Sequence, residues 1–149
     1  MVGADRAPFR NAARSVLTLR YMLDTDSVSF ALRGEGRVGE RILTERPSTL
    51  CVSSITLAEL RYGADKRRSR KLHRIIETFV GSLSVEAFDA AAADRFGIVA
   101  VGLDRRGTPI GGFDALIAAH ALALGITLVT NNIKHFARVE GLRTESWVR

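Results

Sequence analysis

The chain has 149 residues, a formal net charge of +6 at pH 7 and a sequence pI of about 10.4. This length predicts one domain with a real core, and a hydrophobic content of 46% excludes a disordered tail. The excess of Lys and Arg favours a polyanionic partner such as a nucleic acid, although an ordinary solvated surface has the same composition. Cys51 is the only cysteine, which excludes an internal disulfide and indicates a reducing compartment; its apolar neighbours predict a buried strand position.

The first residues differ in character from the rest. Residues 1–18 contain arginines at four-residue intervals, Arg6, Arg10 and Arg14, and a single acid, Asp5. This pattern is weakly typical of an amphipathic transit peptide, but the apolar run of a secretory signal is absent. We expect a flexible or short helical N-terminal extension, followed by one domain over residues 19–149.

No segment predicts a membrane span. The most apolar stretch, residues 115–129, is interrupted by His120 and Gly125 and is shorter than the ~20 apolar residues that a span needs. We therefore expect a cytoplasmic protein without membrane contact.

Strand and helix patterns alternate along residues 19–149. Short apolar runs predict five strands, at residues 19–23, 50–54, 83–85, 126–130 and 143–147. Between the third and fourth runs, apolar residues at helical spacing predict two helices. Their stripes are Phe88, Ala92, Phe96, Val99 and Leu103, weakened by Gly97 and Gly102, and then Phe113, Leu116, Ile117, His120, Ala121 and Leu124, ended by Gly125. This alternation predicts an α/β fold in which helices cover both faces of a parallel sheet.

Three carboxylates fall where such a fold can bring them together. Asp24 ends the first predicted strand, Glu59 lies in the helix after the second, and Asp114 falls in the first turn of a later helix. Taken singly, Asp114 is as readily explained as a helix-start acid and Glu59 as a solvated residue. Ligands of open α/β sheets, however, bind outside the carboxyl ends of the strands. Carboxylates that converge there share protons or hold a cation, which in a basic protein indicates a metal-dependent nuclease.

Four segments carry a resemblance to a known family: YMLDTD, SSITLAELRYGA, GTPIGGFDALIAAHALALG and VTNNIKHFARVEGLRTESW. In this order they resemble the VapC-type toxins of the PIN-domain ribonucleases, over about residues 19–147. The resemblance implies a PIN-like three-layer sandwich with a five-stranded parallel sheet. It also implies a metal-dependent endoribonuclease of a type II toxin–antitoxin system, restrained by a VapB-like antitoxin. Relatives with this C-terminal segment are usually associated with tRNA, the initiator tRNA in particular.

The resemblance also implies roles for individual residues. Asp24, Glu59 and Asp114 are expected to be the catalytic acids and to hold Mg²⁺, for which Mn²⁺ would substitute. Thr25 and Thr130 are expected to line the pocket with their hydroxyl groups. Many PIN domains have a fourth acid where this chain has Asn132, and an amide there argues against a tightly held second metal.

Other polar residues near these motifs allow more than one interpretation. Asp26 stands where the family usually has asparagine; it either contacts the metal site or caps the following helix, and we expect the cap. We expect His135 to be a surface or loop-packing residue and His120 to be a satisfied, partly buried residue. Because no His or Cys is placed as a nucleophile, a metal-activated water should attack the phosphodiester and leave 5′-phosphate and 3′-hydroxyl ends.

A basic run follows Glu59. Such a run is as often a solvated helix face as an interface, but its position makes it the candidate for contact with the RNA backbone. The leading residues are Arg61, Lys66, Arg67 and Arg68, followed by Arg70, Lys71 and Arg74. The expected partners are RNA, an antitoxin and a second copy of the chain, in a heterotetramer or larger complex. Two alternatives remain: a non-catalytic nucleic-acid-binding or regulatory PIN module, and a structure-specific DNA nuclease.

Overall fold

A single sheet of five parallel strands organises the chain. The computed structural model describes residues 18–148, so nearly all of the expected N-terminal extension lies outside the described residues. The strand order is β3-β2-β1-β4-β5, and every neighbouring pair is parallel. The strands are β1 (Tyr21–Leu23), β2 (Leu50–Ser53), β3 (Ser84–Glu86), β4 (Thr127–Val129) and β5 (Thr144–Glu145). The predicted α/β fold is confirmed.

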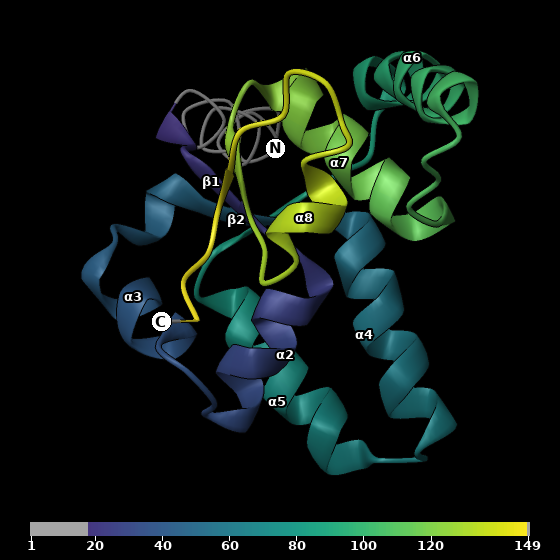
Figure 1. Ribbon diagram of the computed structural model, residues 1–149. Helices are drawn as coiled ribbons and strands as arrows, with labels where there is room; N and C mark the ends of the chain where they lie inside the picture. The colour runs from purple at the N-terminus through teal and green to yellow at the C-terminus, as the bar shows by residue number, and fades with distance from the viewer. Residues whose placement is uncertain (1–17, 149) are drawn as a thin grey trace, which may run out of the picture.

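Helices cover both faces of this sheet (Figure 1). One face carries α2 (Thr25–Arg33), α3 (Val38–Thr44), α4 (Ser54–Lys66) and α5 (Arg70–Gly81). The other carries α6 (Ala90–Arg106) and α7 (Gly112–Leu124), and the short α8 (Ile133–Phe136) follows β4. Among residues 18–148, no helix has the length and apolar composition needed to cross a membrane.

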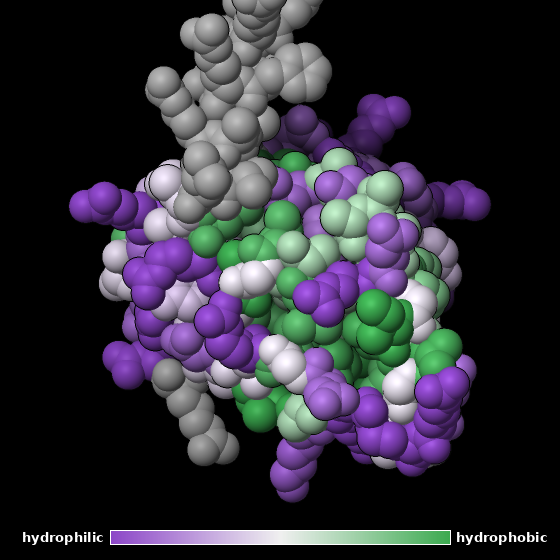
Figure 2. Space-filling model, turned by 90° about the horizontal axis from the view of Figure 1, so that it is seen from above, coloured by the Kyte–Doolittle hydropathy of each residue, from purple (hydrophilic) through white to green (hydrophobic). Residues whose placement is uncertain are grey.

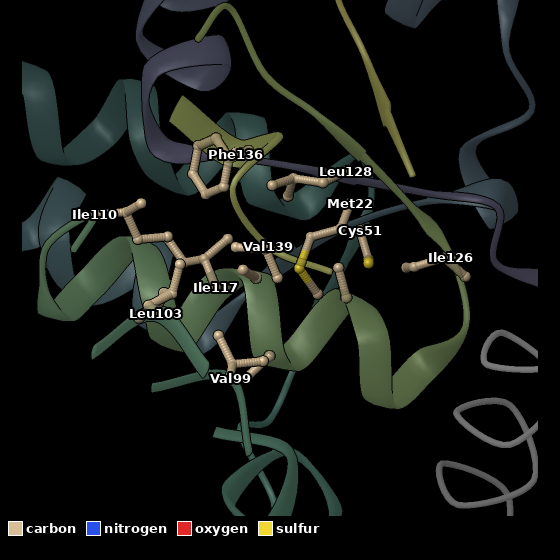
Figure 3. Close-up of a cluster of buried hydrophobic side chains, with 14 of the residues drawn as sticks. Met22, Cys51, Val99, Leu103, Ile110, Ile117, Ile126, Leu128, Phe136 and Val139 are labelled. Atoms are coloured by element: carbon tan, nitrogen blue, oxygen red, sulfur yellow. The ribbon is translucent and has the colours of Figure 1, made fainter. Parts of the chain in front are cut away.

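Two hydrophobic cores form because successive strand residues point to opposite faces. Met22, Cys51 and Leu128 belong to the core under α6 and α7, whereas Leu23 and Val52 belong to the core under α2 to α5. Figure 3 shows the first core, where strand side chains meet those of α6, α7 and α8. Burial on both faces explains why the central strands read as continuous apolar runs.

The observed elements are shorter than the apolar patterns at several ends. Leu19 is buried but precedes β1, because burial extends beyond the residues that pair in the ladder. Phe88 precedes α6, which starts only after Asp89, whose side chain accepts the backbone N–H of Ala92. Gly97 and Gly102 leave α6 unbroken, and α7 ends at Gly125 as predicted, with that glycine at φ 67°.

Apolar side chains also reach the surface of α6. Ile98 is 67% exposed, and beside it a cavity of about 260 Å³ is lined by Val99, Gly102, Leu122 and other residues. Seen from above, the molecule has apolar residues in the middle of its surface with hydrophilic residues around them (Figure 2). None of the three predicted acids lines the α6 cavity.

Candidate active site

Asp24 lies at the carboxyl end of β1 and is held on several sides. Its backbone N–H donates to the carbonyl of Val129 at 2.9 Å, and its Oδ1 accepts the backbone N–H of Ser27 at 2.8 Å. The Thr130 side chain also hydrogen-bonds to the carboxylate. The residue is 3% exposed, and burial raises the pKa of Asp24 from 3.8 to about 6 against the opposing effect of these hydrogen bonds. A cation beside this carboxylate would stabilise its charged form.

Glu59 reaches the same region from α4, the helix that follows the neighbouring strand β2. Because α4 begins directly after β2, with Ser53 as its N-cap, Glu59 lies in the second turn of the helix and is half-buried. Its Oε1 accepts a hydrogen bond from the hydroxyl of Thr25 at 2.6 Å. Burial raises the pKa of Glu59, and the negative charges of Asp114 and Asp26 raise it further, while the bond from Thr25 opposes the shift. Acids from α2, α4 and α7 therefore act on one another.

Asp114 lies in the first turn of α7, as the sequence predicts. Its Oδ2 is 2.9 Å from Nε2 of His135, which lies in α8, the helix that follows β4 in the chain. The side chain of His135 is only 20% exposed, and its ring also meets Phe136 edge-on at 5.2 Å. His135 is thus partly buried and packs beside Phe136, and it also contacts one of the three acids, which the sequence did not predict.

Asp26 does not cap the following helix, contrary to the sequence-based prediction. The N-cap of α2 is Asp24, since the helix begins at Thr25 and the bond to Ser27 comes from Asp24. Asp26 is exposed in the first turn, where its negative charge raises the pKa of Asp24 and of Glu59. Asp26 thus adds a further negative charge beside Asp24 and Glu59.

Thr130 and Asn132 occupy the end of β4. The hydroxyl oxygen of buried Thr130 accepts the backbone N–H of Asn132 at 3.0 Å, which fixes the turn after the strand. Asn132 is exposed, and its side chain makes no capping bond to α8. Its amide is therefore available at the same edge of the sheet as Asp24.

The donor set fits a divalent cation by its chemistry, since Mg²⁺ prefers carboxylate oxygens. Within residues 18–148, however, no three His, Cys, Asp or Glu side chains are already arranged around one ion. Glu59 is turned toward Thr25, and Asp114 toward His135. Occupying the site would require these two acids to exchange hydrogen bonds for the cation, which would also relieve the raised pKa of Glu59.

The predicted RNA-contacting residues fall into two groups. Arg61 donates to the ring Nδ1 of His73 at 2.9 Å, to the carbonyl of His73 and to the carboxylate of Glu77, so it bridges α4 to α5. His73 in turn contacts Asp65 through Nε2 at 2.7 Å. The second group is exposed: Lys66, Arg67 and Arg68 lie at the turn between the two helices, and Arg70, Lys71 and Arg74 follow on α5.

His120 and Cys51 are core residues. The Nδ1 of His120 is 2.8 Å from Oγ of Ser53, the residue that caps α4, and burial lowers the pKa of His120. Burial raises the pKa of the Cys51 thiol. The prediction for Cys51 is confirmed; His120 has a hydrogen-bond partner as predicted but is fully and not partly buried. His120 also supports the start of the helix that carries Glu59.

The chain is similar to known proteins in sequence and in structure. The PIN domain family matches residues 21–142. The tRNA(fMet)-specific endonuclease VapC of Shigella flexneri is 41% identical over 130 residues, which cover 87% of this chain and 98% of that relative. Ribonuclease VapC2 of Haemophilus influenzae is 39% identical over 131 residues, with coverages of 87% and 99%.

Solved structures agree. DNA-bound VapBC from Salmonella typhimurium contains a chain that is 40% identical with a TM-score of 0.79, covering 87% of this chain and 98% of its own length. VapBC-1 from nontypeable Haemophilus influenzae gives 32% identity and a TM-score of 0.80, with coverages of 88% and 100%. The chain therefore belongs to the PIN-domain family. Within that family it is a VapC-type protein, as the four sequence segments indicate.

Proposed function

We propose that this VapC-type protein is a metal-dependent endoribonuclease toxin that cleaves tRNA, with initiator tRNA as the first candidate substrate. The observation that carries the proposal is the group of Asp24, Glu59 and Asp114 at the carboxyl edge of the sheet, where burial raises the pKa of the first two and Asp114 adds to the shift of Glu59. The choice of tRNA is supported by relatives named tRNA(fMet)-specific endonucleases.

Mg²⁺ is the proposed cofactor, with Mn²⁺ as a substitute, and the three acids would hold it. When bound, such an ion lowers the pKa of a water and screens charge on the phosphodiester in the transition state. Asp24 is kept in place by Ser27 and Thr130, so its carboxylate needs little reorganisation. Asn132 offers an amide that can contact a phosphate or a bound water.

The exposed turn between α4 and α5 is proposed to contact the RNA backbone. Within residues 18–148, Lys66, Arg67 and Arg68 have no carboxylate partner of the kind that Arg61 has in Glu77. Contacts of this kind hold a substrate in register without reading its sequence. Arg61 is assigned to the helix bridge instead.

A VapB-like antitoxin and a second copy of the chain are the proposed protein partners, in the cytoplasm. Three carboxylates suit an inserted arginine, whose planar guanidinium pairs with carboxylates through two hydrogen bonds. The exposed apolar residues of α6 suit contact between copies. The solved relatives are VapBC complexes, which supports an antitoxin partner.

Chelation and substitution of the acids test the proposal. We expect Asp24→Asn, Glu59→Gln and Asp114→Asn each to remain folded but to lose at least about 100-fold in RNA cleavage, because several kcal/mol of transition-state stabilisation depend on the ion. Asp94→Asn, which removes an exposed carboxylate from α6, is the matched control and should cleave normally.

Cleavage of tRNA that persists in EDTA would contradict the metal mechanism. RNA binding without any cleavage by the wild-type protein in Mg²⁺ or Mn²⁺ would favour the non-catalytic PIN module. Cleavage of branched or looped DNA in preference to RNA would favour the DNA nuclease.

A further inference from the structure

Two aromatic side chains that the proposed mechanism does not use lie next to its acids. Tyr62 of α4 is 66% exposed and Phe113 of α7 is 58% exposed. Among the Phe, Tyr and Trp residues of the described part of the chain, these two alone are exposed. A single exposed hydrophobic residue is ordinary on a protein surface. Here, however, each of the two exposed rings is on the same helix as a proposed catalytic acid and within three residues of it.

Helix geometry places Tyr62 beside Glu59, whereas Phe113 is next to Asp114 only along the chain. Tyr62 follows Glu59 by three residues on α4, a spacing that puts two side chains on one face with Cβ atoms about 5–6 Å apart. Phe113 directly precedes Asp114 in the first turn of α7. Because α4 packs against α7 and the charge of Asp114 acts on Glu59, the two acids lie near each other. Tyr62 on α4 therefore lies beside Glu59, and Phe113 on α7 is the residue next to Asp114.

Charge beside Tyr62 indicates what kind of molecule would meet these rings. The Nζ of Lys66 lies 5.9 Å from the centre of the Tyr62 ring, and Arg67 and Arg68 follow in the turn. An aromatic ring next to a cation offers a stacking face and an anion contact together. A nucleic acid strand presents the matching pair of groups, a base and its phosphate.

We propose that Tyr62 and Phe113 stack on nucleobases beside the phosphate that is cleaved. This inference rests on the proposed endoribonuclease function and adds what the acids alone do not supply, a contact with the bases. Stacking on a side chain requires bases that are not stacked within a duplex, so the rings select unpaired RNA. Because every base has a π face, the selection is for accessible bases and tolerates many sequences.

Binding of short single-stranded RNA tests the proposal. Fluorescence anisotropy is measured with the full chain carrying Asp24→Asn, so that the RNA stays intact. On this background, Phe113→Leu and Tyr62→Leu should each weaken binding about tenfold, whereas Phe113→Trp and Tyr62→Phe should retain it. Leu43→Ala, at an 86% exposed apolar position on α3, is the matched control and should have no effect.

RNA that lacks single bases shows whether the rings act through stacking. An abasic nucleotide at the contacted position should weaken binding by the parent and abolish the difference between the parent and Phe113→Leu. In the otherwise wild-type enzyme, Phe113→Leu should raise KM for RNA and leave kcat nearly unchanged.

The possible failures are distinguishable. Equal RNA affinity of the parent, Phe113→Leu and Tyr62→Leu overturns the stacking proposal and leaves the endoribonuclease function standing. A wild-type chain that neither binds nor cleaves RNA overturns both. If the leucine variants lose RNA affinity only together with self-association, measured by sedimentation, the rings are contacts between protein chains and the stacking proposal is wrong.

Discussion

Asp24 performs two tasks that conflict when no cation is present. As the N-cap of α2 it satisfies the backbone N–H of Ser27, which favours a carboxylate at the start of the helix. As a residue that is 3% exposed it is also a buried charge, and the pKa of about 6 reflects the resulting penalty. At neutral pH the buried negative charge of Asp24 therefore lowers the stability of the fold, and a divalent cation would offset this penalty.

For this reason, Asp24→Asn should stabilise the cation-free protein and at the same time abolish RNA cleavage. Asparagine is also a good N-cap and carries no charge. Because the pKa of Asp24 is raised in the folded state, the folded protein binds this proton more tightly, and stability is lost as pH rises from about 4 through 6. The shift from 3.8 to about 6 corresponds to ~3 kcal/mol, at ~1.4 kcal/mol per pKa unit.

Thermal unfolding in EDTA measures this effect. We expect the melting temperature of Asp24→Asn to exceed that of the wild type at pH 7.5, and the difference to shrink toward pH 4. A wild-type protein that is equally stable or more stable at pH 7.5 would contradict the penalty assigned to the buried charge.

Asn132→Asp tests whether the end of β4 contributes to the metal site. The residue is exposed and its side chain caps no helix, so the fold should tolerate the change. An added carboxylate oxygen beside the three acids should tighten Mn²⁺ binding, measured by calorimetry. Asn131→Asp places the same charge on the preceding exposed residue and is the matched control. If both variants bind Mn²⁺ alike, Asn132 lies outside the reach of the metal.

The positions of the three acids in the fold were predictable because Asp24 ends an apolar run, Glu59 lies in the helix that follows another, and Asp114 lies at the start of a helix. The contact between His135 and Asp114 was not, because it joins α7 to α8 across β4 and depends on tertiary packing. The error at Asp26 has a different cause. In the segment Asp24-Thr25-Asp26 both acids are good N-caps, and the choice depends on a helix start that a sequence locates only to within one or two residues.

At the scale of elements, the hairpin of α4 and α5 links the acid site to the basic turn (Figure 1). Arg61, His73 and Glu77 join the two helices, and the turn contains Arg68, with φ at 51°. Positive φ is unfavourable for a residue with a Cβ, so contacts elsewhere in the hairpin must hold this conformation. The bridge made by Arg61 is suited to that task.

Neutralising the turn should weaken RNA binding without altering its sequence preference. The combined variant Lys66→Gln, Arg67→Gln and Arg68→Gln removes three charges from exposed positions. For single strands, each lost phosphate contact reduces the slope of log K against log salt concentration by about 0.7 in magnitude. The loss of three contacts should therefore reduce this slope by about 2. Binding titrations at several salt concentrations measure it, with Arg95→Gln and Arg105→Gln on α6 as controls. An unchanged slope would leave the turn as a solvated helix end.

The elements themselves were predictable to different degrees. The strands β1, β2 and β4 and the helix α7 left clear apolar patterns because many of their residues are buried. The edge strands β3 and β5 have no buried residue and left shorter patterns. The helix α3 left none, since Val38 is its only buried residue and no stripe can form. Strand ends were overestimated, as at Leu19, because a sequence records burial and not hydrogen-bond pairing.

At the scale of the molecule, the toxin proposal makes a prediction about growth. Expression of the wild-type chain alone should arrest growth, because uncontrolled tRNA cleavage stops translation, and co-expression of the proposed VapB-like antitoxin should restore it. Glu59→Gln, expressed to the same level, should be harmless. A folded wild-type chain that is harmless at high level would contradict the toxin proposal and favour the non-catalytic module.

The position of β1 decides when the site can exist. This first strand is central: Tyr21 lies opposite Leu50 on one side and Thr127 on the other, and the backbone N–H of Asp24 bonds to Val129. Until a ribosome has made β4, one edge of β1 is bare and Asp24 lacks the bond that fixes it, because pairing between distant segments must await both. Under the proposed function, the nascent chain thus carries no working nuclease until β4 has been made. A fragment that ends before β4 should therefore leave tRNA intact.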